Sequence, residues 1–238
     1  MSDIFLIVCA VLPAAVLMVY IYKKDTLEKE PSGLLKKLVL FGIIATIPAI
    51  VLESVGSALL SVFFETNTLA YTVLMNFLVI AGAEEGLKFF FLKRKSWNCP
   101  DFNCQFDGVV YAVFVSLGFA LLENIMYVLQ YGFSTAVARA LLSVPGHACF
   151  GVFMGAFYGM AKRYENGGCP QNCRNCLRRS VLIPMFLHGV YDFIATTHVV
   201  GSAVFLLFVA VIFFFGIRLT NKLSKEDCYI DAPHWYSI

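Results

Sequence analysis

Runs of apolar residues long enough to cross a lipid bilayer recur along almost the whole of this chain. An α-helix rises about 1.5 Å per residue, so roughly 20 apolar residues cross the ~30 Å hydrocarbon core. Only 14% of the 238 residues are charged, whereas a soluble domain usually carries about 25%. Because so few charges cannot cover a globular surface, the sequence predicts an integral membrane protein.

The apolar runs are continuous rather than alternating, which favours membrane helices over a β-barrel. No Pro/Gly/Ser-rich linker divides them, so residues 1–238 are expected to form a single membrane domain. Lys23 and Lys24 follow the first run as a stop-transfer pattern, which favours a retained helix over a cleaved signal peptide. The predicted fold is an all-α transmembrane helix bundle with about seven spans: 4–22, 38–62, 70–92, 107–130, 139–161, 180–197 and 199–219.

Basic residues are distributed unevenly along the chain. Sixteen of the 18 Lys and Arg residues lie in four polar stretches: 23–37, 93–106, 162–179 and 218–238. The other three connections hold none, and cytoplasmic loops of membrane proteins are enriched in Lys and Arg. This alternation predicts an N-terminus outside and a C-terminus in the cytoplasm. Each basic cluster is small and flanks an apolar segment, so the expected partner is the lipid bilayer and not a nucleic acid.

Five of the eight cysteines fall in loops that are expected to be cytoplasmic: Cys99, Cys104, Cys169, Cys173 and Cys176. Because that compartment is reducing, disulfide bonds are not expected there. The spacings within these two loops suit a structural zinc site between them. Separate free thiols are the alternative interpretation.

Ionisable residues in the apolar segments are the strongest functional signal, because a charge at the centre of a membrane helix costs about 2.5–3.5 kcal/mol. In segment 70–92, Glu84 and Lys88 lie four residues apart on one helix face and can pair, while Glu85 points about 100° away. Two adjacent carboxylates in a low-dielectric medium cannot both ionise cheaply. One of them therefore suits the role of a general base or acid.

Three further segments carry polar motifs. Glu123 and Asn124 are adjacent in the fourth span, and His147 in the fifth precedes three glycines at four-residue spacing, which let another helix approach closely. His188 and Asp192 lie one turn apart in the sixth, so Asp192 can orient the imidazole or add a ligand. Together, these residue types can hold Zn²⁺ while leaving a position open for water.

Structural interpretations exist for each motif alone. A single intramembrane histidine often makes only an interhelical hydrogen bond, and the pair of Glu84 and Lys88 can be purely structural. Glu53, in the second span, has no companion motif and is interpreted as an interhelical polar contact. Four polar motifs on four successive spans nevertheless favour a joint site.

Taken in order, these motifs resemble those of the PrsW family of bacterial intramembrane proteases. The resemblance rests on five patterns over residues 25–192: Asp25-x-x-x-x-Glu30-Pro31, Glu84-Glu85-x-x-Lys88, Phe119-x-x-x-Glu123-Asn124, His147 with Gly151, and His188-x-x-x-Asp192. The related CAAX prenyl endopeptidases and bacteriocin-processing enzymes place His where this chain has Glu123, and usually Asn where it has Asp192. These differences favour the PrsW branch.

The resemblance implies a helical protease of the bacterial cytoplasmic membrane that cuts a membrane-anchored protein. An anti-sigma factor is such a protein, and the protease would make the first cut in it. We expect Glu85 to activate a water, with Glu84 sharing its proton or anchoring Lys88; the two glutamates can exchange these roles. The expected donor to the oxyanion is Asn124. The expected ligands of a metal ion, Zn²⁺ by ligand type, are Glu123, His147 and His188, with Asp192 in support.

Three alternatives remain open at this stage. A metal-free, glutamate-type protease would activate water with a carboxylate and a histidine alone. A proton- or ion-coupled transporter would use the same residues as a relay, although the chain lacks paired inverted repeats with broken helices. A catalytically silent scaffold would use them only for packing.

Overall fold

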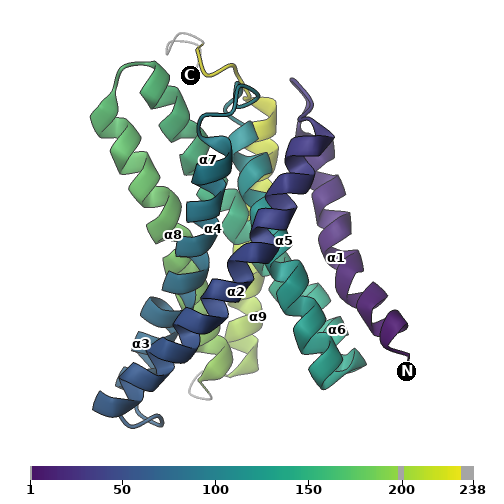
Figure 1. The fold of residues 1–238 in the computed structure, drawn as a ribbon, viewed down its shortest axis with the longest axis vertical. Coiled ribbons are helices and arrows are strands. Elements are labelled where there is room, and N and C mark those ends of the chain that lie inside the picture. The colour runs from purple at the N-terminus through teal and green to yellow at the C-terminus, as the bar shows by residue number, and fades with distance from the viewer. Residues whose placement is uncertain (1, 198–200, 232–238) are drawn as a thin grey trace.

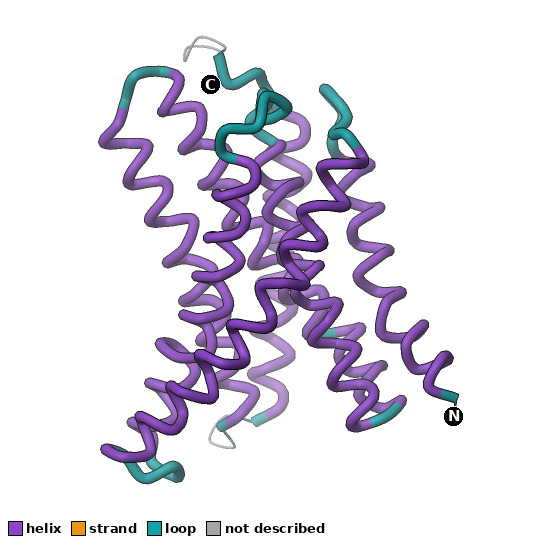
Figure 2. The backbone as a smooth tube through the Cα atoms, viewed as in Figure 1, coloured by secondary structure: helices purple, strands orange, loops and turns teal. Residues whose placement is uncertain are grey.

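The computed structural model describes residues 2–197 and 201–231, and within this part of the chain every regular element is a helix (Figures 1 and 2). The predicted all-α fold is therefore confirmed. The elements are α1 (Asp3–Lys24), α2 (Ser32–Phe63), α3 (Leu69–Leu74), η1 (Met75–Ile80), α4 (Ala81–Ser96), α5 (Asp107–Tyr131), α6 (Phe133–Leu141), α7 (Ser143–Asn166), α8 (Pro170–Thr196) and α9 (Ser202–Lys225).

Five helical segments of the described chain are long and apolar enough to cross a membrane: Asp3–Lys24, Ser32–Phe63, Asp107–Tyr131, Phe133–Asn166 and Ser202–Lys225. Two further parts of the bundle, the consecutive elements α3, η1 and α4 and the helix α8, carry two of the charged motifs that the sequence singles out, Glu84-Glu85-x-x-Lys88 and His188-x-x-x-Asp192. The count of seven spans stays a prediction. The boundary predicted near 197–200 falls partly on residues 198–200, which lie outside the described residues, as do residues 232–238 of the last basic stretch.

The described parts of the four basic stretches lie at one end of the bundle, the upper end in Figure 1, which we call the basic end. Helix α1 ends and α2 begins there, the α4–α5 and α7–α8 connections lie there, and α9 ends there. Helix α1 begins at the opposite end (Figure 1). This arrangement is what the charge alternation predicts, and the orientation in a membrane stays a prediction.

Helix α5 is the central helix of the bundle, because residues 107–120 are buried on all faces. Helix α7 crosses it at very short range. A Cβ atom on Gly155 would lie 2.4 Å from Cα of Val109, and one on Gly159 would lie 2.1 Å from the carbonyl oxygen of Gln105. The predicted close approach of a neighbouring helix to the glycine ridge is confirmed, and it holds His147 of α7 against the other motifs.

The peripheral helices expose apolar side chains over most of their outer faces. Val8 and Leu12 of α1 and Leu207 and Phe214 of α9 are among the large exposed hydrophobic residues. A surface of this kind would associate in water, and a bilayer covers it in a multi-pass membrane protein.

The eight cysteines form no disulfide bond among the described residues. All eight are free thiols, and among the described residues no three of them bring their sulfur atoms together as a metal site requires. The structural zinc site between the two loops therefore stays a prediction, with separate thiols as its alternative.

Candidate active site

A π-helical turn, η1, directly precedes the two glutamates of α4. Such turns are rare and frequently occur at functional sites. The side-chain amide of Asn76 in η1 donates to Thr196 Oγ1 over 3.0 Å, at the last turn of α8. A Cβ on Gly189 would lie 2.5 Å from the ring of Phe77, so only glycine allows this close approach of α8 to η1. These contacts hold the start of α4 against the histidine-bearing part of α8.

Lys88 lies at the centre of the site and is fully buried. Its ammonium donates to Glu84 Oε2 over 2.9 Å and to Glu85 Oε1 over 2.7 Å. The predicted Glu84–Lys88 pair is therefore present. Lys88 also binds Glu85, because residues three apart are neighbours on a helix as well as residues four apart. The ring of Phe119 on α5 lies beneath the ammonium, with its centroid 4.2 Å from Nζ.

His147 connects Lys88 to Glu123. Its Nδ1 lies 3.0 Å from Lys88 Nζ, and its Nε2 lies 3.0 Å from Glu123 Oε2. An ammonium can only donate, so Nδ1 is the accepting nitrogen and the hydrogen sits on Nε2, from which it is donated to the carboxylate. Both nitrogens of this buried ring are therefore used, and its tautomer follows from its neighbours.

His188 lies between two carboxylates. Its Nδ1 is 3.0 Å from Glu85 Oε1, and its Nε2 is 3.3 Å from Asp192 Oδ2, one turn further along α8. The ring stacks on Phe150, with centroids 4.9 Å apart. An imidazole can donate to both carboxylates only as the imidazolium. This geometry agrees with the orienting role that the sequence suggests for Asp192.

Arg139 of α6 is a site residue that the sequence reasoning missed. Its Nη2 lies 2.9 Å from Glu123 Oε2, and its Nε donates to Asn124 Oδ1 over 2.9 Å. One feature of the sequence could have identified Arg139. It is a basic residue that lies outside the four basic stretches. Asn124 in turn donates to the carbonyl of Ala10 over 2.7 Å, so its amide joins α1 to α6. Its role as an oxyanion donor stays a prediction.

A cavity of about 360 Å³ lies beside these residues. Its polar wall is formed by Glu53, Asn76, Glu84, Glu123, Tyr127, Arg139, Ser143, His147, His188, Tyr191, Asp192 and Thr196. Glu53, interpreted from the sequence as an interhelical contact, thus lies on the cavity wall. Glu85 and Lys88 do not line the cavity but lie behind Glu84. Because Thr196 ends α8, whose first residue lies at the basic end, the cavity lies toward the opposite end of the bundle.

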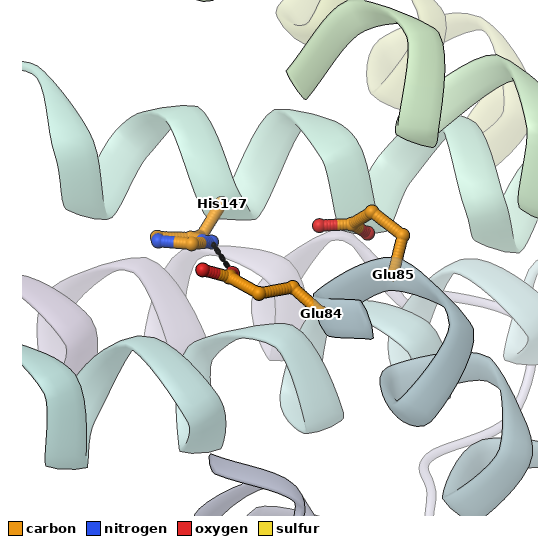
Figure 3. A group of neighbouring side chains, drawn as sticks. All are labelled: Glu84, Glu85 and His147. Atoms are coloured by element: carbon orange, nitrogen blue, oxygen red, sulfur yellow. Dashed lines mark ion pairs between the residues drawn. The ribbon is translucent and has the colours of Figure 1, made fainter. Parts of the chain in front are cut away.

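One group of three residues in the described chain can hold a metal ion: Glu84, Glu85 and His147, whose ligand atoms lie within 4.8 Å of one another (Figure 3). Two carboxylates and an imidazole suit a divalent ion such as Zn²⁺. Oε2 of Glu85 is buried, with no hydrogen-bond partner among the described residues, and is therefore available to a ligand. The donor set fits a metal, although Lys88 binds these same three residues.

The other residues predicted as ligands meet in pairs. Glu123 contacts the second nitrogen of His147, and Asp192 contacts the second nitrogen of His188. The structure thus brings all the predicted site residues except Asn124 to the cavity wall or directly behind it. It does not gather Glu123, His147, His188 and Asp192 around one point among the described residues.

Comparison with known proteins gives one consistent result. A sequence model of the family described as "PrsW family intramembrane metalloprotease" matches residues 30–217. The chain is 39% identical to "Protease PrsW" of Geobacillus kaustophilus over 189 residues, which cover 79% of each protein. It is 32% identical to "Protease PrsW" of Bacillus subtilis over 222 residues, 93% of this chain and 97% of the relative. No solved structure matches.

Proposed function

This chain belongs to the PrsW family of intramembrane metalloproteases, and from that premise we propose that Glu84 activates the water that cleaves a membrane-anchored protein. The protein is a peptidase and a multi-pass protein of the bacterial membrane. The observation that carries the proposal is the position of Glu84 on the cavity wall, with Glu85 and Lys88 behind it. We further propose that residues 1–238 act as a single membrane protease domain.

The proposal exchanges the roles expected from the sequence for the two glutamates. Water and substrate reach the site through the cavity, so the base must face it. Glu84 lines the cavity, and Lys88 holds its Oε2, so we assign Oε1 to the attacking water. Glu85 is fully buried, and its Oε1 accepts from both Lys88 and His188. Glu85 is therefore a positioning residue in this scheme.

In the proposed reaction, Glu84 takes a proton from water as the water oxygen bonds to the scissile carbonyl carbon. The negative charge that develops on the carbonyl oxygen needs a preorganised donor in a site that excludes bulk water. We assign this role to His188, because its 3.3 Å contact with Asp192 is its longer one and lies on the cavity side. The C–N bond then breaks, and Glu84 returns its proton to the leaving amine.

The metal of the family description has a donor set here. Glu84, Glu85 and His147 would hold a divalent ion, for which Zn²⁺ is our choice by ligand type. When bound, such an ion polarises a carbonyl and acidifies water. The set predicted from the sequence, Glu123, His147, His188 and Asp192, is the alternative. A metal-free, glutamate-type reaction is a second alternative, in which Lys88 supplies the positive charge.

The proposed substrate is a membrane-anchored protein whose cut site is extended, because only an unpaired backbone can reach the side chains of the cavity. The cavity lies away from the basic end. With the basic end in the cytoplasm, the cut would fall in the outer half of the membrane or at its outer surface. This position supports our proposal of a first cut in an anti-sigma factor.

The experiment that tests this function compares new protein termini in membrane fractions from cells that carry wild-type protein, Glu84→Gln or a control variant. Glu65→Gln is a suitable control, because Glu65 is exposed in the connection between α2 and α3. We expect one anchored protein to lose its cut in Glu84→Gln and to keep it in Glu65→Gln. Identical termini in all three strains would contradict the proposal.

A further inference from the structure

The ammonium of Lys88 occupies the pocket between the three residues that could bind a metal. Nζ lies 2.9 Å from Glu84 Oε2, 2.7 Å from Glu85 Oε1 and 3.0 Å from His147 Nδ1. An ammonium carries three hydrogens and no acceptor. Its three hydrogen bonds are thus directed to one atom of each member of this group, and the residue is fully buried while it makes them.

A metal ion and this ammonium cannot bind the three residues in the same way at once. Zinc lies about 2.0–2.2 Å from carboxylate oxygen and imidazole nitrogen. An ion coordinated by the atoms that Lys88 now contacts would fall within about 3 Å of Nζ. Two like charges at that separation repel strongly where water is excluded. His147 Nδ1 also has a single lone pair, which serves either the ammonium or a metal.

We propose that Lys88 is an internal counter-cation that competes with a divalent metal ion for Glu84, Glu85 and His147, so that metal binds only as the Lys88 side chain withdraws. The inference rests on the proposed function, because these three residues belong to the proposed catalytic site. In the metal-free protein, Lys88 holds the two carboxylates in place through its hydrogen bonds. Its withdrawal lowers the apparent metal affinity, since part of the binding free energy goes into displacing a buried ion pair.

The test measures zinc affinity by calorimetric titration. The full-length protein is purified in detergent, bound metal is removed with a chelator, and zinc is then titrated in. Lys88→Met keeps most of the side-chain length and removes the charge, while Lys88→Arg keeps a charge. Lys36→Met is the control, because Lys36 is exposed on α2. We expect Lys88→Met to bind zinc at least tenfold more tightly than wild type, and Lys36→Met to bind as wild type does. Equal zinc affinity of wild type and Lys88→Met would overturn the proposal, as would weaker binding by Lys88→Met.

Lys88→Met leaves two buried carboxylates without a counter-ion, so this variant can fail to fold. A second measurement therefore uses the wild-type protein alone. A small amine-acetylating reagent is added with and without saturating zinc, and modification of Lys88 is quantified by mass spectrometry. We expect zinc to increase the labelling of Lys88 severalfold while the labelling of Lys36 stays constant. One bound equivalent of zinc with unchanged labelling of Lys88 would overturn the proposal.

Failure of this inference is distinguishable from failure of the proposed function. If Glu84→Gln abolishes cleavage while Lys88→Met leaves zinc affinity unchanged, the protease assignment stands and the competition is overturned. If Glu84→Gln cleaves as wild type does while Lys88→Met binds zinc more tightly, the competition stands and the role of Glu84 falls.

Discussion

The guanidinium of Arg139 lies 2.9 Å from the carboxylate of Glu123, an ion pair that joins the short helix α6 to the central helix α5. The same carboxylate oxygen accepts from His147 Nε2 over 3.0 Å. Arg139 therefore holds the carboxylate of Glu123, which in turn orients His147 on the cavity wall. In the sequence, Arg139 lies far from the paired glutamates.

Replacing Arg139 by Leu should lower the rate of cleavage more than it changes substrate binding. The partners that orient a functional histidine typically contribute about 10- to 100-fold to activity, and we expect a loss of kcat in that range. Arg139→Lys should restore part of the rate, because it returns a positive charge to Glu123. Arg218→Leu is the matched control, since Arg218 is exposed on α9. Wild-type kinetics for Arg139→Leu would show that Arg139 has no role in cleavage.

The contact between α5 and α7 should tolerate no side chain at Gly155. A Cβ there would lie 2.4 Å from the Val109 backbone, so Gly155→Ala must push two central helices apart. Overpacking of this kind costs about 1–3 kcal/mol, and we expect a lower thermal unfolding midpoint in detergent. Gly33→Ala is the control, because a Cβ at that helical glycine meets nothing within 4 Å. Equal midpoints for the two variants would show that the helices are not held this closely.

A pH dependence should arise at the basic end, where the connection between α1 and α2 docks on α5. The hydroxyl of Tyr111 donates to Glu30 Oε2 over 2.6 Å. Burial, together with the nearby charges of Asp25 and Asp101, raises the pKa of Glu30 to about 7, although the hydrogen bond from Tyr111 opposes the rise. The folded protein therefore binds a proton that the unfolded chain has lost above its ordinary pKa of 4.5.

The sign follows from this difference in bound protons. Stability is highest below pH 4.5 as far as Glu30 is concerned, falls as pH rises toward about 7, and levels off above that value. Burial raises the pKa of Asp25 to about 6, which acts in the same direction. We expect the thermal unfolding midpoint to decrease as the pH is raised from 5 to 8. The decrease should be smaller in Glu30→Gln. Glu28→Gln, exposed in the same connection, should follow the wild-type curve. A wild-type slope in Glu30→Gln would contradict this account.

The helices could be predicted from the sequence because their apolar lengths match a bilayer, but their ends and breaks could not. Helix α2 begins at Ser32, six residues before the predicted span, since hydropathy detects the apolar part and not its polar first turns. The segment predicted as 139–161 is interrupted at Leu142 between α6 and α7. Pro145 lies in the first turn of α7, where a proline is tolerated because its missing N–H would have no helical partner. The π-helical turn η1 has no comparable signal.

The candidate site could be predicted as a set of motifs but not as a set of contacts. Helical spacing says which residues share a face, so the pair of Glu84 and Lys88 was accessible from the sequence. Helical spacing does not say how neighbouring helices are rotated about their axes. The contact between Lys88 and His147 could therefore not be predicted from the sequence. Glu53 and Arg139 belong to no motif, and only the fold brings them to the cavity.

The most direct test of the role of Glu84 is cleavage of one anchored protein by purified enzyme in vesicles, with Glu84→Gln compared with wild type at equal amounts of bound zinc. Both proteins should fold alike and bind the substrate, because Gln keeps the shape of the side chain. We predict that wild type produces one new terminus and that Glu84→Gln produces none. Cleavage by Glu84→Gln at the wild-type rate would contradict the claim that this carboxylate activates the water.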